Sequence, residues 1–137
     1  MADAVTSQTI LDGERLFIAK FTNISDGAGE TAVTKIDVSA LNKSAAGNAC
    51  NGVKINKVWA QTQGMIVDII WDATPAVLCE TIPADKFYLM DYSSFGGLPN
   101  NAGAGVNGDV AFTTVGADAG DRYTIVLECI KTYGAAP

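Results

Sequence analysis

The chain has 137 residues, of which 48% are hydrophobic and 18% are charged, and its net charge is −6. These values are typical of one globular domain that buries a core without disulfides or metals, and they exclude a disordered chain. Lys and Arg are scattered singly, which argues against nucleic-acid binding through phosphates, and no apolar run reaches the ~20 residues that cross a bilayer.

The N-terminal stretch MADAVTSQTILDGERL has neither the basic start nor the apolar centre of a signal peptide. Residues 1–14 are mostly small and polar, and we expect them to form an extended N-terminal arm that a partner orders. Residues 15–133 are expected to form the folded domain, and residues 134–137 a short tail.

Alternating or continuous apolar residues, bounded by turn residues, predict eight strands. Two of them lie in residues 53–71, and the others are residues 15–24, 32–38, 76–82, 86–92, 109–115 and 121–133. Residues 39–52 and 93–108 read as loops, the first with at most one helical turn. The pattern predicts an all-β, single-domain antiparallel β-sandwich of about eight strands, and a jelly roll is one eight-strand arrangement that limits exposed edges.

We expect residues 53–71 to form a central hairpin with its turn at Gln63-Gly64, because glycine tolerates the positive φ of a tight turn. Pairing Thr62 with Met65 places one set of apolar residues on a single, inward face. That set is Val58, Ala60, Val67, Ile69 and Trp71. The same register brings Lys57 close to Asp68 on the outer face, and a slip of one residue would exchange the two faces.

The chain contains no histidine, which excludes Ser-His-Asp and Cys-His catalysis within it. Three widely separated cysteines make a zinc site improbable, and we expect reduced thiols, with one Cys79–Cys129 bridge left open. Residues 103–108 match GxGxxG, but a strand-like run follows where a dinucleotide site needs a helix. The acidic residues near one another in sequence lack a catalytic spacing, and residues 26–30 lack the ligand pattern of an EF-hand. The sequence therefore predicts no catalytic residue, no metal and no cofactor.

Four segments together resemble small structural proteins of tailed bacteriophages. They are residues 26–39, the run IIWD at 69–72, residues 95–103 (FGGLPNNAG) and the final strand at 121–131. The class that they resemble is the capsid decoration (cement) protein, a β-sandwich bound outside the shell. The resemblance implies a virion location on the capsid exterior after assembly in the host cytoplasm. It also implies the major capsid protein as partner and a homo-oligomer, with a trimer favoured over a dimer.

A cement protein stabilises a shell because it binds only the assembled state. We expect its contacts in the arm and in the loop at residues 95–106, with five apolar anchors: Ile10, Leu11, Phe95, Leu98 and Val106. Three other functions stay open at this point: a neck or tail component of the same virion, a carbohydrate-binding β-sandwich that stacks sugars on Trp59 or Tyr92, and an enzyme that uses carboxylates alone.

Overall fold

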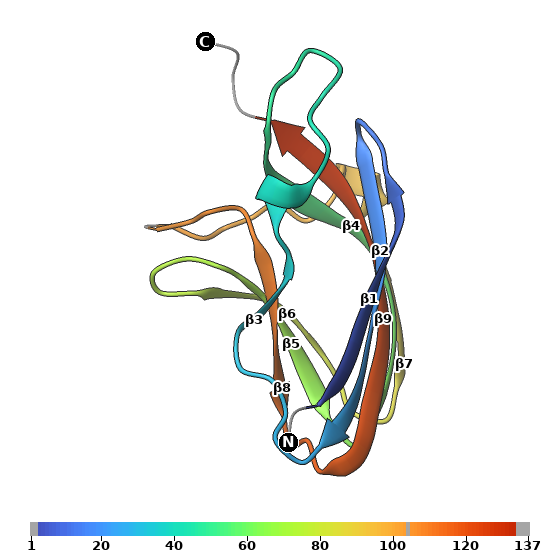
Figure 1. Cartoon of the computed structure of the whole chain (residues 1–137). Helices are drawn as coiled ribbons and strands as arrows, with labels where there is room; N and C mark the ends of the chain where they lie inside the picture. The colour runs from blue at the N-terminus through green and yellow to red at the C-terminus, as the bar shows by residue number, and fades with distance from the viewer. Residues whose placement is uncertain (1–2, 104, 134–137) are drawn as a thin grey trace.

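Two antiparallel sheets stacked face to face make up the structure, a computed structural model that describes residues 3–103 and 105–133 (Figure 1). The elements in chain order are β1 (Ala4–Asp12), β2 (Leu16–Asp26), β3 (Val33–Ile36), the 3-10 turn η1 (Val38–Ala40), β4 (Cys50–Gln63), β5 (Ile66–Trp71), β6 (Val77–Ile82), β7 (Phe87–Asp91), the 3-10 turn η2 (Ser93–Phe95), β8 (Val110–Val115) and β9 (Ala119–Tyr133). The predicted all-β sandwich is confirmed, and all eight predicted strands are present.

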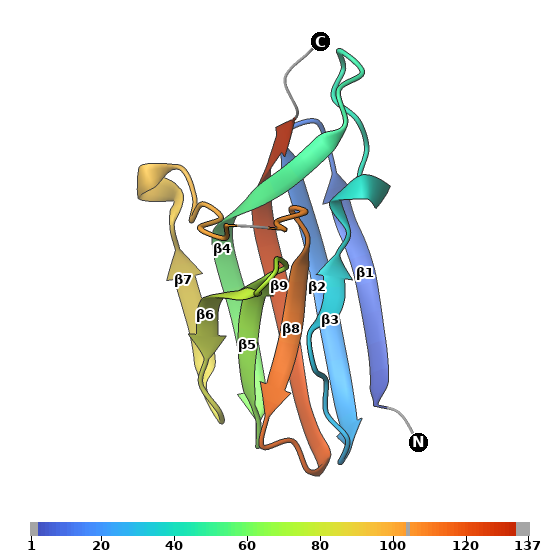
Figure 2. The same ribbon diagram turned by 90° about the vertical axis from the view of Figure 1, so that its left-hand side faces the viewer.

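The order of the strands is that of a jelly roll with one strand added. The first sheet runs β1-β2-β9-β4-β7 and the second runs β3-β8-β5-β6, so that β2 to β9 form the two interleaved four-stranded layers of that fold. Strand β1 extends the first sheet beyond β2. The edges of the five-stranded sheet are therefore β1 and β7, which lie on opposite sides of the molecule (Figure 2).

The predicted central hairpin is wrong, because its two strands lie in different sheets. Strand β4 pairs with β9 and β7, whereas β5 pairs with β6 and β8. The turn at Gly64 carries the chain from one layer to the other, and Met65 at the bend is 0% exposed. A hairpin tip would expose this residue, whereas the crossing between the layers buries it. Lys57 and Asp68 consequently do not face each other across a strand pair.

The inward face predicted for these strands is nevertheless correct. Val58, Val67 and Ile69 are each fully buried, with Ala60 and Trp71 almost so. Side chains alternate between the two faces of a strand wherever that strand pairs, so the inward face does not depend on the partner. The core between the layers includes edge-to-face contacts of Phe112 with Phe21 and with Tyr123.

Ten of the residues expected in the N-terminal arm lie in or beside a strand of the domain. Residues 4–12 form β1, which pairs along its length with β2, and the Asp3 side chain accepts a hydrogen bond from Asn23 Nδ2 at 3.1 Å. The described part of the arm is thus an edge strand of the first sheet. The short tail, residues 134–137, lies outside the described residues. All three cysteines carry free thiols, and Cys50 and Cys129 are buried.

Candidate functional site: the outer face of the five-stranded sheet

The outer face of the five-stranded sheet carries the outward side chains of β7, β4, β9, β2 and β1. Cross-strand pairing aligns its outward side chains in rows from β7 to β1. The three central rows are Phe87–Gln61–Thr124–Thr22–Thr6, then Leu89–Trp59–Val126–Lys20–Gln8, then Asp91–Lys57–Glu128–Ile18–Leu11. Because side chains directly opposite each other on neighbouring strands lie close enough to touch, each row forms a continuous strip of side chains.

The β7 side of this face is apolar. Phe87 is 69% exposed and Leu89 is 53% exposed, and Trp59 and Val126 continue the strip as half-buried neighbours. We call these four residues the outer patch. Isolated exposed apolar residues are ordinary on a protein surface, whereas a contiguous exposed apolar group is a common feature of binding surfaces.

Positive charge surrounds the outer patch in an otherwise acidic protein. Four bases project among the rows, or in the rows directly above and below them: Lys20, Lys54, Lys57 and Arg122. Asp91 and Glu128 flank Lys57 in the third row, and Asp85 lines the depression at the other end of the patch. The pKa of Asp91 lies below its usual value because Ser93 donates hydrogen bonds to it and Lys57 stands across the strands. The face is thus apolar with a basic surround.

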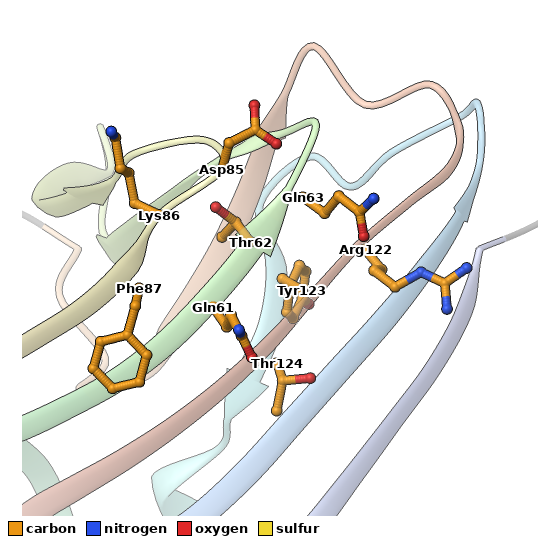
Figure 3. Close-up of a pocket in the computed structure, with 9 residues that line it drawn as sticks. All are labelled: Gln61, Thr62, Gln63, Asp85, Lys86, Phe87, Arg122, Tyr123 and Thr124. Atoms are coloured by element: carbon orange, nitrogen blue, oxygen red, sulfur yellow. The ribbon is translucent and has the colours of Figure 1, made fainter.

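A shallow depression of about 440 Å³ lies at one end of the outer patch (Figure 3). Its lining comes from β7, β4 and β9 and from the residues just before β7: Gln61, Thr62, Gln63, Asp85, Lys86, Phe87, Arg122, Tyr123 and Thr124. Figure 3 shows the Phe87 ring beside Gln61 and the Arg122 side chain extending away from the strand. The depression combines the exposed ring of Phe87 with side-chain amide, hydroxyl and guanidinium groups, which are capable of hydrogen bonding.

The five contact residues expected from the sequence do not form one surface. Ile10 and Leu11 lie on the exposed edge strand β1, whereas Phe95 is in η2, which follows β7 at the opposite edge. Val106 is 47% exposed in the loop before β8. Leu98 forms an isolated β-bridge with Ile55 and packs against the core.

Glu30, in the segment tested for an EF-hand pattern, has a structural role. Glu30 is 6% exposed, and its carboxylate accepts the Tyr123 hydroxyl at 2.6 Å and pairs with the Lys35 ammonium at 2.5 Å. Burial, followed by the hydrogen bond and charge of Glu30, raises the pKa of Tyr123. This cluster joins the two sheets, and no local signal in the sequence reveals the contact between Glu30 and Tyr123, which are 93 positions apart.

A second inter-sheet contact closes the side of the sandwich where β6 and β7 form the edges. The Glu80 carboxylate on β6 accepts hydrogen bonds from the hydroxyls of Tyr88 at 3.1 Å and of Tyr92 at 2.6 Å. Burial and the neighbouring Glu80 charge raise the pKa of both tyrosines. The Tyr92 hydroxyl is thus bound at this edge, and Phe87 is the exposed aromatic ring of the outer patch.

Three other acidic side chains accept hydrogen bonds from turns or from a neighbouring strand. Asp85 accepts the Gly64 amide, and Asp121 accepts the Asp118 amide. Asp68 accepts the Thr81 hydroxyl at 2.7 Å. Within residues 3–103 and 105–133, no group of three or more His, Cys, Asp or Glu side chains is placed to hold a metal ion.

The fold and this surface define a jelly-roll domain with an apolar, basic-rimmed sheet face. Comparisons with protein-family models, with curated proteins and with solved structures find no match. In the described part of the chain, no helix is long and apolar enough to span a membrane.

Proposed function

We propose that this protein is a non-enzymatic virion structural protein of the capsid decoration type. It binds the major capsid protein on the outside of the shell through the outer face of its five-stranded sheet. The observation that carries the proposal is the outer patch, in which Phe87 and Leu89 are more than half exposed beside Trp59. The resemblance of four sequence segments to phage structural proteins supplies the class of partner.

The chemistry of the face specifies what its partner looks like. Burying Phe87 and Leu89 against a partner removes apolar surface from water, at roughly 25 cal/mol per Å². The surrounding bases Lys20, Lys57 and Arg122 favour a partner surface with an acidic rim, because opposite charges steer association and exclude wrong partners. A shell stabilised in this way gains stability by mass action, with no reaction catalysed.

The first test is the copy number of this chain in purified particles of the virus that encodes it, measured by quantitative mass spectrometry. Hundreds of copies per particle support decoration of the shell. A dozen copies or fewer supports the neck or tail position instead, and absence from the particle refutes both.

The second test uses a matched pair of substitutions. Leu89→Lys, at a 53% exposed position in the outer patch, is expected to weaken binding to purified undecorated shells at least about tenfold. Leu78→Lys, at a 52% exposed position on β6 of the other sheet, is the control and should bind like the wild type. Equal weakening by both substitutions would show that the outer patch is not the binding face.

The depression beside Phe87 favours a second candidate, the binding of a carbohydrate. An open aromatic ring next to amide and guanidinium donors suits the apolar face and the hydroxyls of a sugar ring. Glycan-array binding that is lost in Phe87→Ala and retained in Leu78→Ala would support it. An array without any bound glycan, together with shell binding, leaves the decoration function alone.

A further inference from the structure

The four edges of the two sheets differ in how well they resist pairing with another strand. Natural edges avoid such pairing by being short, charged or bulged. Strand β3 has four residues and carries Lys35, and β7 has five residues and ends at Asp91. In β6, Cys79 is an extra residue that forms a bulge, since Ile69 and Ile70 pair with Glu80 and Leu78. These three edges carry the usual protection.

Strand β1 has almost none of this protection. Its nine residues, AVTSQTILD, contain no proline and no charge before Asp12, and every residue from Ala4 to Leu11 is exposed. A register shift between Thr9 and Leu11 marks a bulge at Ile10, which leaves a regular run over residues 4–9. Six regular residues are about the length of a typical strand in a sheet, so the run is long enough to pair.

The edge is held in place although it contributes nothing to the core. At the start of the strand, the Asp3 carboxylate accepts hydrogen bonds from the side-chain amide of Asn23 and from the backbone amides of Asp26 and Gly29. At its end, Asp12 pairs with the Lys131 ammonium at 2.6 Å. The two acids that flank the neutral run are thus both bound within their own chain, and the strand is presented as a preformed, uncharged template.

We propose that two copies of this chain pair through β1, antiparallel about a two-fold axis at Ser7, and so join their five-stranded sheets into one ten-stranded sheet. Residues that lie opposite each other on paired strands project from the same side of the sheet. The two-fold axis therefore lies between two copies of one residue, here Ser7. It places Ser7 opposite Ser7, Thr6 opposite Gln8, and Val5 opposite Thr9. No charge meets a like charge along the seam, and β-branched residues suit such a pairing.

A second copy is the occupant that the structure favours. The chain carries a net charge of −6, whereas residues 4–11 carry no charged side chain, so two copies can approach along this run without like charges facing each other. Beside the run, a recess of about 210 Å³ between β1 and β3 exposes Val5 and Val33, and a second copy at this edge covers it. Of the trimer and the dimer expected from the resemblance, this two-fold contact supports the dimer, and it does not depend on the proposed function.

Sedimentation of the purified full chain over a concentration series tests the seam. We expect a dimer for the wild type and a shift towards monomer in Ser7→Lys, which places two ammonium groups opposite each other and weakens association at least about tenfold. Gln61→Lys adds the same charge at an exposed position three strands away and should leave the dimer intact. A monomeric wild type, a trimer, or a dimer insensitive to Ser7→Lys would overturn the proposal.

Cross-linking checks the seam independently of any effect of the lysine on folding. Opposite Cα atoms of an antiparallel pair are about 4.5–5.5 Å apart, within the range that a disulfide spans. Ser7→Cys is therefore expected to give a covalent dimer on mild oxidation, whereas the wild type and Gln61→Cys stay monomeric under denaturing electrophoresis. Ser7→Cys that gives no more covalent dimer than Gln61→Cys would contradict the two-fold axis at Ser7.

Discussion

Replacing Lys131 by methionine is expected to destabilise the fold by about 3–5 kcal/mol, the usual cost of leaving one member of a buried ion pair alone. The Lys131 side chain is 0% exposed, and its ammonium donates to Asp12 Oδ1 at 2.6 Å, to the Gly13 carbonyl at 2.9 Å and to the Asn42 carbonyl at 2.8 Å. These bonds tie the β1–β2 turn and the loop before β4 onto β9. Methionine keeps the apolar stem and removes only the donors.

The magnitude follows from what remains behind. The Asp12 carboxylate, 15% exposed, is only partly reached by water once its partner is gone, and the Gly13 and Asn42 carbonyls each lose a donor. Because the free energy of unfolding of a small domain is about 5–15 kcal/mol, the loss is a large part of the total stability. Lys43→Met removes the same charge from an exposed loop position and should change stability by less than about 0.5 kcal/mol.

Urea unfolding followed by tryptophan fluorescence measures the effect as a fall in midpoint at an unchanged slope. The double variant with Asp12→Asn should lose less than the sum of the two single losses, because the partners are in direct contact. Burial lowers the pKa of Lys131, but the hydrogen bond and charge of Asp12 outweigh it and hold the pKa above 10.5. The stabilisation is therefore fully present below pH 10.5 and is lost as the pH rises through the folded-state pKa. A loss below about 1 kcal/mol for Lys131→Met would refute the reasoning.

Two further predictions concern backbone space and alkaline stability. Gly108 and Gly47 share a φ of +86°, but a Cβ at Gly108 would stand 2.1 Å from the Asn51 carbonyl oxygen, whereas nothing lies within 4 Å at Gly47. Both alanine variants carry backbone strain of about 1–2 kcal/mol, and Gly108→Ala should cost at least about 2 kcal/mol more in urea unfolding; equal costs would mean that the loop yields freely. Three of the four tyrosines have raised pKa values, so the unfolded chain releases their protons first and stability should fall as the pH rises above 10.0. The residues are Tyr88, Tyr92 and Tyr123. Stepwise urea titrations with tyrosinate absorbance check this, and full ionisation in the native state near pH 10 would contradict it.

Local patterns predicted much of the fold but less of the candidate site. The position of each strand and its buried face follow from a period of two, which any partner strand preserves. Alternation with Val58 and Ala60 places Trp59 on the outer side of β4, where it is half-buried in the outer patch. The sequence places Phe87 and Leu89 in an apolar strand, and nothing local indicates that their side of the strand stays exposed.

What the sequence by itself determined is therefore the set of β-strands, their inward faces and the absence of histidine chemistry, since each is a property of neighbouring residues or of composition. Only the tertiary structure decided that β4 pairs with β9 instead of β5, that Glu30 and Lys131 are buried with distant partners, and that β1 is an open edge. The physical reason is that pairing and burial depend on which segments meet in space. Strands with the same alternation of apolar and polar residues are equally suitable partners for one another until the complete fold selects among them.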